Sequence, residues 1–216
     1  MAGSVTLFLS FCLWEGIRRS VLPQEKAITI IGVTHAIIVS ILSLLCVLDL
    51  PCISSTYLFS FSAGYFLWDT LVVLFLIPFD PSFVVHAVGC FFVFYLGNVP
   101  LLREYGTNVL LYELSTPFYY WRKTLIQSGN TQGLLFTFVE ATFGGLFFLV
   151  RILYGVPLTV EIILYFGRTI PTLETRYKQC VGAYIACFCV VSCFLNLYWF
   201  SFMVKRFHSK SQTKTE

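Results

Sequence analysis

Six side chains of this sequence can carry a charge although each lies within a long apolar stretch. They are His35, Asp69, His86, Glu113, Glu140 and Arg151. A charged side chain at the centre of a membrane helix costs roughly 2.5–3.5 kcal/mol on insertion scales, so such groups normally face a bundle interior. An imidazole can act as a general base, and a carboxylate can orient that base by hydrogen bonding. The chemistry available is therefore proton transfer, or binding of a polar group, inside a membrane.

Asp69 is the acid that is hardest to explain as a helix-end residue. It lies far from both ends of its apolar stretch, on one helical face with Ser62 and Phe66. An ionised carboxylate there needs a partner, and a histidine or an arginine is expected. His35 and His86 are the candidates, and together with Asp69 they are the candidate catalytic residues. A lone histidine in a helical bundle is, however, more often a hydrogen-bonding group than a catalyst.

Glu140 and Arg151 share a second face, with Gly144 and Phe147 between them. Two interpretations of this face stay open. It faces the bundle interior, or the two charges lie near helix ends, where a long side chain such as arginine can extend to the membrane surface.

The composition of the chain indicates that these groups lie in a membrane and not in water. Hydrophobic residues make up 57% of the 216 residues and charged ones 12%, against about 25% in soluble domains. The sequence therefore predicts an all-α, polytopic membrane protein without a separate soluble catalytic domain. The net charge of +3 is explained by membrane topology, so we expect no nucleic-acid partner.

Cysteine spacing gives no sign of a metal centre or a redox motif. The eight cysteines include no CxxC pair and no cysteine and histidine cluster. Most lie in apolar stretches, so we expect buried thiols, no metal and no cofactor.

Seven apolar spans are predicted, at residues 4–14, 27–48, 57–77, 83–97, 106–120, 134–154 and 181–204. The first is either a short anchor helix or a signal sequence, so whether residues 1–16 cross the membrane is left open. The fifth contains Glu113 and Pro117 and is either a shielded crossing or a re-entrant segment. Asp80 before Pro81 is a typical helix start, which makes spans three and four an antiparallel hairpin.

Basic residues orient these spans. Arg18, Arg19 and Lys26 follow the first span, Arg122 and Lys123 the fifth, and Lys205, Arg206, Lys210 and Lys214 the last. With seven crossings these clusters share one side, which the positive-inside rule makes cytosolic. Residues 1–26 are then an anchor helix and basic loop, 27–204 the membrane domain, and 205–216 a basic cytosolic tail. Arg168, Arg176 and Lys178 fall on the opposite side and count against this orientation.

Several motifs resemble the TLC domain family, named for translocating-chain-associating proteins, longevity-assurance ceramide synthases and a ceroid-lipofuscinosis protein. They are Thr34-His35-Ala36, Ser62-Ala63-Gly64-Tyr65-Phe66-Leu67-Trp68-Asp69, Phe83-Val84-Val85-His86, Glu113-Leu114-Ser115-Thr116-Pro117-Phe118 and Val150-Arg151-Ile152. The resemblance covers residues 27–204. It implies a six-helix barrel around a lipid-accessible cavity, with His35, Asp69, His86, Glu113 and Arg151 as cavity residues. Residence in the endoplasmic reticulum is also implied, with the plasma membrane as the alternative.

The ceramide synthase branch of that family differs at one place. Its enzymes carry two adjacent histidines followed by an acidic stretch, whereas here His86 is followed by Ala87 and no acidic run. Ceramide synthase activity is therefore not expected, and the chain resembles the short TLC proteins outside that branch.

Three hypotheses for function follow. The first is a protein that binds membrane lipids or acyl chains and influences lipid composition, without established catalysis. The second is an acyltransferase-like lipid enzyme in which His86 is the base. The third is a cargo receptor or assembly factor that binds other membrane proteins.

Overall fold

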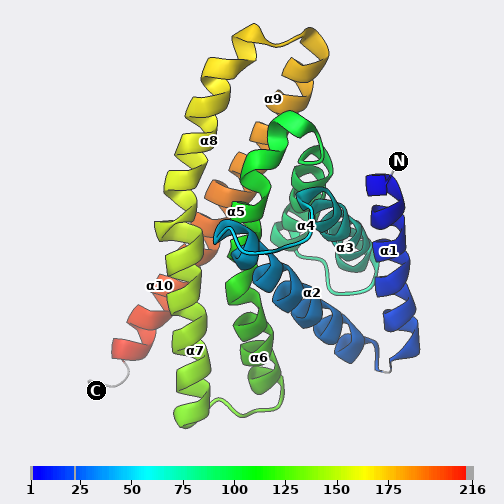
Figure 1. The fold of residues 1–216 in the computed structure, drawn as a ribbon. Coiled ribbons are helices and arrows are strands. Elements are labelled where there is room, and N and C mark those ends of the chain that lie inside the picture. Colours follow the sequence, from blue (N-terminus) through cyan, green and yellow to red (C-terminus); the bar gives the residue numbers. More distant parts are fainter. Residues whose placement is uncertain (1, 22, 213–216) are drawn as a thin grey trace.

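The computed structural model describes residues 2–21 and 23–212, which form seven helical rods and no strand (Figure 1). The first four rods are single helices: α1 (Ala2–Ser20), α2 (Gln24–Val47), α3 (Ser55–Phe75) and α4 (Pro81–Leu96). The fifth joins η1 (Pro100–Tyr105), α5 (Gly106–Leu110), η2 (Leu111–Ser115) and α6 (Thr116–Gln127). The sixth joins α7 (Leu134–Phe147), η3 (Phe148–Leu153), α8 (Gly155–Thr169) and η4 (Ile170–Thr172). The seventh joins α9 (Thr175–Cys189), η5 (Val190–Leu195) and α10 (Asn196–Gln212).

Four of these rods are long and apolar enough to cross a bilayer: Gln24–Val47, Ser55–Phe75, Leu134–Thr172 and Thr175–Arg206. The helix Pro81–Leu96 is apolar but shorter. The predicted class, an all-α polytopic membrane protein, is confirmed. The tail was predicted over residues 205–216, of which 213–216 lie outside the described residues.

The predicted bounds of the last two spans are wrong. The sixth was expected to end at Tyr154, but the helix continues through Pro157 to Thr172, and the seventh begins at Thr175. Just before Pro157 the chain is π-helical over Phe148–Leu153, and Tyr154 donates its backbone N–H to the Leu149 carbonyl. Such local π adjustments let membrane helices tolerate a proline that lacks an N–H, so Pro157 does not end this rod.

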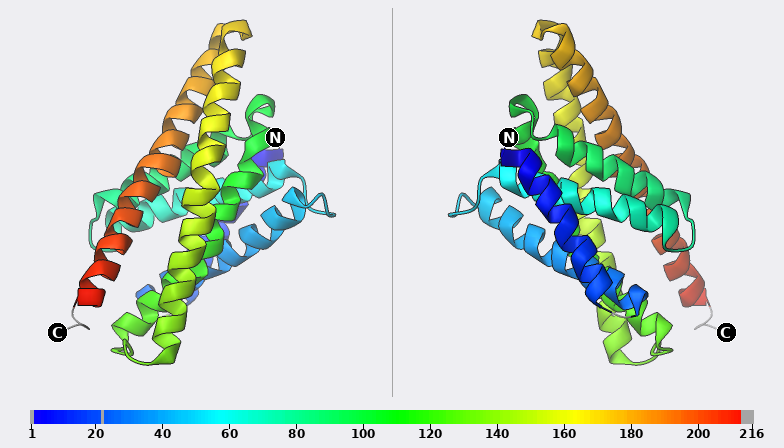
Figure 2. Two further views of the ribbon diagram at one scale, coloured as in Figure 1. Left: turned by 90° about the vertical axis from the view of Figure 1, so that its left-hand side faces the viewer. Right: turned by 90° about the vertical axis from the view of Figure 1, so that its right-hand side faces the viewer.

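Helix α3 packs closely against both α1 and α4. Helix α1 lies against α3, where the Ser10 hydroxyl donates to the Phe61 carbonyl at 2.7 Å and Trp14 is only 1% exposed. Asp80 caps α4 by accepting from the Ser82 backbone N–H at 2.8 Å, with Pro81 at the first helical position. The predicted start of α4 is thus confirmed, and α3 and α4 run antiparallel side by side (Figure 2).

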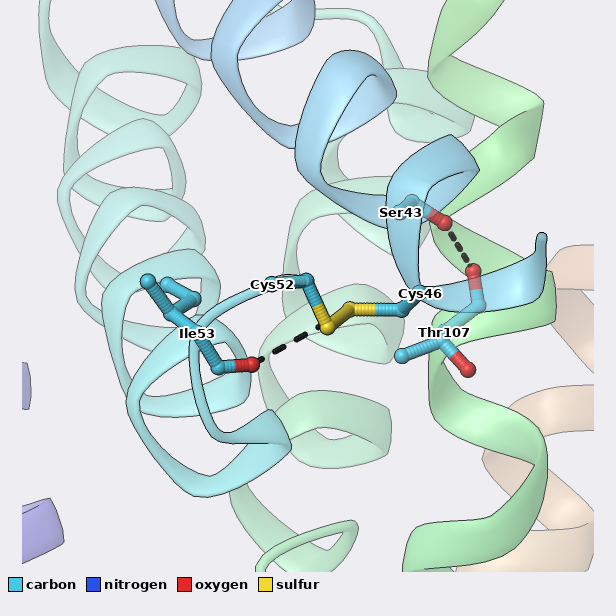
Figure 3. Close-up of a disulfide and its surroundings, with 5 residues drawn as sticks. All are labelled: Ser43, Cys46, Cys52, Ile53 and Thr107. Atoms are coloured by element: carbon cyan, nitrogen blue, oxygen red, sulfur yellow. Dashed lines mark hydrogen bonds between the residues drawn. A yellow bond between two sulfur atoms is a disulfide. The ribbon is translucent and has the colours of Figure 1, made fainter. Parts of the chain in front are cut away.

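The expectation of buried thiols is wrong for Cys12, which is exposed, and for Cys46 and Cys52, which are not thiols. Cys46 and Cys52 form a disulfide with their Cα atoms 5.6 Å apart (Figure 3). The cause is the tight reversal after α2, where Asp49 has a φ of +54° and Leu50 donates its N–H to the Leu45 carbonyl. The apolar pattern places Cys46 inside a helix and Cys52 after its end. Only the local turn brings their two sulfur atoms together.

The same end of α2 is fastened to the fifth rod. The Ser43 hydroxyl donates to the Thr107 carbonyl at the start of α5 (Figure 3). One residue earlier, Gly106 packs against the ring of Phe59, a side chain of α3 with no solvent exposure. Three rods therefore meet within van der Waals distance at this end of the bundle.

A methyl group at Gly106 should destabilise the protein, because its Cβ would overlap the Phe59 ring. We expect Gly106→Ala to cost about 1–3 kcal/mol of overpacking, measured as a lower midpoint of thermal unfolding in detergent. Gly145→Ala is the matched control, since nothing lies within 4 Å of its new Cβ. An unchanged midpoint for Gly106→Ala would show that Phe59 can move away.

Candidate functional site: an intramembrane polar cavity

A cavity of about 280 Å³ lies among the rods that follow α1. Every one of those six rods contributes to its wall, for example through Ile28, Asp69, His86, Glu113, Arg151 and Trp199. None of its lining residues, within the part of the chain that is described, comes from α1. The cavity is thus a property of residues 24–212, with α1 packed outside on α3.

Four of the five predicted cavity residues converge on this wall. They are Asp69 from α3, His86 from α4, Glu113 from η2 and Arg151 from η3. His35 does not line the cavity. Its ring stacks on Tyr65 at 3.7 Å between centroids, and Tyr65 in turn forms part of the wall. Whether lipid occupies this space stays a prediction.

Arg151 is held as a buried cation. Its guanidinium lies 3.7 Å from the Glu113 carboxylate, both side chains are at most 10% exposed, and the Phe147 ring lies 5.3 Å away. The helix continues well beyond it, so the interpretation of Arg151 as a helix-end side chain is wrong. A buried charge requires a close partner and further hydrogen bonds, and Glu113 supplies the partner.

Hydrogen bonds complete the coordination of Arg151. Its Nε donates to the Tyr112 carbonyl at 3.1 Å and the Ser115 hydroxyl at 3.2 Å, both on η2. One terminal nitrogen donates to the Asn196 amide oxygen on α10, and the other to the Thr116 hydroxyl, each at 3.3 Å. One side chain thereby joins the fifth, sixth and seventh rods.

Asp69 has no comparable partner. Its carboxylate lines the cavity and makes no hydrogen bond or ion pair with another described residue. The expected histidine or arginine partner is therefore wrong for these residues. His86 instead places Nδ1 3.6 Å from the Cys90 thiol and its ring 5.4 Å from the ring of Trp199. His35 is fully buried, and neither ring nitrogen has a hydrogen-bond partner among the described residues.

Basic side chains line another part of the cavity. Arg122 and Lys123 of α6 contribute to its wall. A second cavity of about 190 Å³ shares Arg122 with the first and adds Glu140 and Arg206. The Glu140 carboxylate accepts a hydrogen bond from Arg122 at 3.3 Å and lies 3.6 Å from Arg206. These two guanidinium groups neutralise its charge.

Sequence patterns did not identify the aromatic part of the wall. Tyr65, Tyr119, Tyr120 and Trp199 all line the cavity. A signal for Tyr120 was present in Gly32, because a Cβ at that position would overlap the Tyr120 phenol. The lack of a side chain at Gly32 on α2 therefore makes room for a cavity residue.

Comparison with known families places the six rods that follow α1 within one domain. The model of the TLC domain matches residues 27–205, which contain all of the residues that line the cavity. The chain belongs to the TLC domain family. No solved structure matches it.

Similar proteins are found in yeasts. Topoisomerase I damage affected protein 4 of Saccharomyces cerevisiae is 34% identical over 107 residues, 47% of this chain and 38% of that protein. An uncharacterised TLC domain-containing protein of Schizosaccharomyces pombe is 37% identical over 62 residues, 28% of this chain and 21% of its own length. A second uncharacterised TLC domain-containing protein, from Saccharomyces cerevisiae, is 33% identical over 99 residues, which are 44% of this chain and 31% of that protein. The matched segments thus span well under half of these relatives, and none of the three is named a ceramide synthase.

Removal of the Arg151 charge should destabilise this TLC domain strongly, because Glu113 would be left buried without its cation. We expect Arg151→Met to cost about 3–5 kcal/mol, measured by thermal or denaturant unfolding in detergent. The double variant Arg151→Met/Glu113→Gln should recover part of that loss. Arg176→Gln is the control, because its ion pair with Glu174 is about 75% exposed and worth about 0–1 kcal/mol. Equal effects of Arg151→Met and Arg176→Gln would contradict the assigned role.

Proposed function

We propose that this TLC domain protein binds membrane lipid in its central cavity and thereby influences membrane lipid composition. The observation that supports the proposal is a cavity with two kinds of wall. Aromatic and aliphatic side chains such as Phe66, Val73 and Phe143 suit a hydrocarbon chain, and Asp69, Glu113 and Arg151 suit a polar group. An amphiphile satisfies both kinds of wall.

The volume limits how much of a lipid can enter. Ligand pockets are commonly about 300–1,000 Å³, and this cavity, at about 280 Å³, lies just below that range. It suits a head group and the adjoining part of a chain, with the remaining hydrocarbon in the bilayer.

A lipid enzyme with His86 as base is the second candidate, because His86 lines the same cavity as two carboxylates. A catalytic imidazole is usually oriented by a hydrogen bond to a third group. The neighbours of His86 are the Cys90 thiol and the rings of Phe66 and Trp199, and no carboxylate bonds to it among the described residues. This arrangement supports binding better than acid–base catalysis. No feature of the described residues favours the cargo-receptor hypothesis over either.

We further propose that the carboxyl terminus is cytosolic. The α1–α2 and α6–α7 connections and the end of α10 lie at one end of the molecule (Figure 1), and the helix segments next to them carry Arg18, Lys26, Lys123 and Arg206. The Cys46–Cys52 disulfide lies at the other end of α2. Disulfides persist in oxidising compartments and basic loops stay in the cytosol, so two independent rules support one orientation. The endoplasmic reticulum is proposed from the family alone, with the plasma membrane as alternative.

A bulky side chain that fills the cavity should reduce the bound lipid. Val73 lines the cavity and is 4% exposed, so the indole of Val73→Trp would occupy ligand space. Val85→Trp is the matched control. It introduces the same side chain, but Val85 lies on the outer face of α4 and is 42% exposed. Lipid per mole of purified protein, measured by mass spectrometry, should fall several-fold for Val73→Trp only. Equal lipid content in both folded variants would refute the lipid-binding proposal.

A glycosylation reporter tests the orientation. Fused after Glu216 it should remain unmodified, and inserted after Thr172, in the turn between η4 and α9, it should be glycosylated. The reverse pattern would invert the whole topology.

A further inference from the structure

We infer that the cavity is selective for phospholipids whose head group carries a cationic amine beside its phosphate, with the amine at Asp69 and the phosphate toward Lys123. This inference rests on the proposed lipid-binding function and names its ligand class. It follows from which charges in the cavity wall are already neutralised and which are not.

Most of the charged side chains in the wall already have partners. Arg151 is neutralised by Glu113 at 3.7 Å and Arg122 by Glu140 at 3.3 Å. Asp69 and Lys123 also line the cavity, and neither makes an ion pair or hydrogen bond with another described residue. The wall thus offers one unneutralised carboxylate and one unneutralised ammonium group.

The surroundings of Asp69 favour an organic cation. Tyr65 and Phe66 precede it by four and three residues on α3, so they lie on its face of the helix. Tyr120 and Trp199 supply further rings to the same wall. Aromatic faces attract quaternary and primary ammonium groups, and a carboxylate beside them adds the countercharge. This combination of side chains is suited to a choline or ethanolamine group.

The rest of the wall excludes simpler ligands. A purely anionic head group could neutralise Lys123, but it would share the cavity with two carboxylates, Asp69 and Glu113. A simple alkylamine would neutralise Asp69 and leave Lys123 without an anion. A zwitterionic phospholipid neutralises both groups, and its chains meet the apolar side chains of Val72, Val73 and Ile77.

Short-chain lipids with identical chains test the head group directly. The probes are dihexanoyl phosphatidylcholine, phosphatidylethanolamine and phosphatidylglycerol, titrated below their micellar concentrations into detergent-purified, delipidated full-length protein. All three carry the phosphate, and the glycerol head group lacks the amine. We expect the two amine lipids to bind about tenfold more tightly than phosphatidylglycerol, a difference of about 1.4 kcal/mol. Equal or tighter binding of phosphatidylglycerol would overturn the inference.

Two variants, each of which removes one charge, test which side chain contacts the amine and which contacts the phosphate. Asp69→Asn, which keeps the shape of the side chain, should remove the preference for amine lipids without weakening phosphatidylglycerol. Lys123→Gln should weaken all three lipids by a similar factor and leave the preference intact. If Asp69→Asn does not fold, judged by its unfolding midpoint, the wild-type comparison and Lys123→Gln still decide the question. A preference unchanged in folded Asp69→Asn would show that the carboxylate is not what recognises the amine.

Failure of the inference is distinguishable from failure of the proposed function. If Val73→Trp loses co-purifying lipid but the three probes bind alike, the cavity binds lipid without selecting the head group. If Val73→Trp keeps its lipid and no probe binds, both proposals are wrong.

Discussion

The buried ion pair of Arg151 and Glu113 is the interaction on which the membrane domain depends. Both side chains are at most 10% exposed, so each charge needs a close protein partner. The Glu113 carboxylate and the carbonyl of Tyr112 come from the fifth rod, and the Asn196 amide oxygen from the seventh. The sixth and seventh rods are π-helical at this level, over Phe148–Leu153 and Val190–Leu195. Because π turns change the direction in which side chains point, these two segments affect where Arg151 and Asn196 lie.

This network also determines what is left for a ligand. Glu113 and Arg151 neutralise one another, and Glu140 engages Arg122 and Arg206. If every charge in the wall were paired, a ligand could be selected only by its shape and not by its charge. Asp69 and Lys123 are the exceptions among the described residues that line the cavity, so the proposed selectivity for a head group rests on them and not on the residues that hold the helices together.

The sequence predicted those features that depend on interactions between residues close together in the chain. The apolar spans, the Asp80 cap and the inward position of Asp69 follow from helical periodicity and from the cost of a charge in hydrocarbon. The partner of Arg151, the Tyr120 ring over Gly32 and the Cys46–Cys52 bond depend on which rods become neighbours or how a turn closes, which no single stretch specifies. His35 illustrates the limit. Its charge and motif matched those of the cavity residues, but Tyr65 lies between it and the space it was expected to line.

The length of the sixth rod determines how far Arg168, Arg176 and Lys178 lie from the end that is proposed to be cytosolic. Glu140 is held by Arg122 and Arg206, a polar cluster suited to the cytosolic edge of the hydrocarbon. Arg151 follows eleven residues later, about 16 Å deeper at 1.5 Å per residue, near the middle of a core about 30 Å thick. Arg168 follows 28 residues after Glu140, about 42 Å along the same rod. In the proposed orientation Arg168 therefore lies beyond the opposite face of the hydrocarbon, as do Arg176 and Lys178 at the start of α9. Basic residues in short connections near span ends all contribute to topology, so these three count against the proposed orientation, but the clusters that contain Arg18, Arg122 and Lys205 outnumber them.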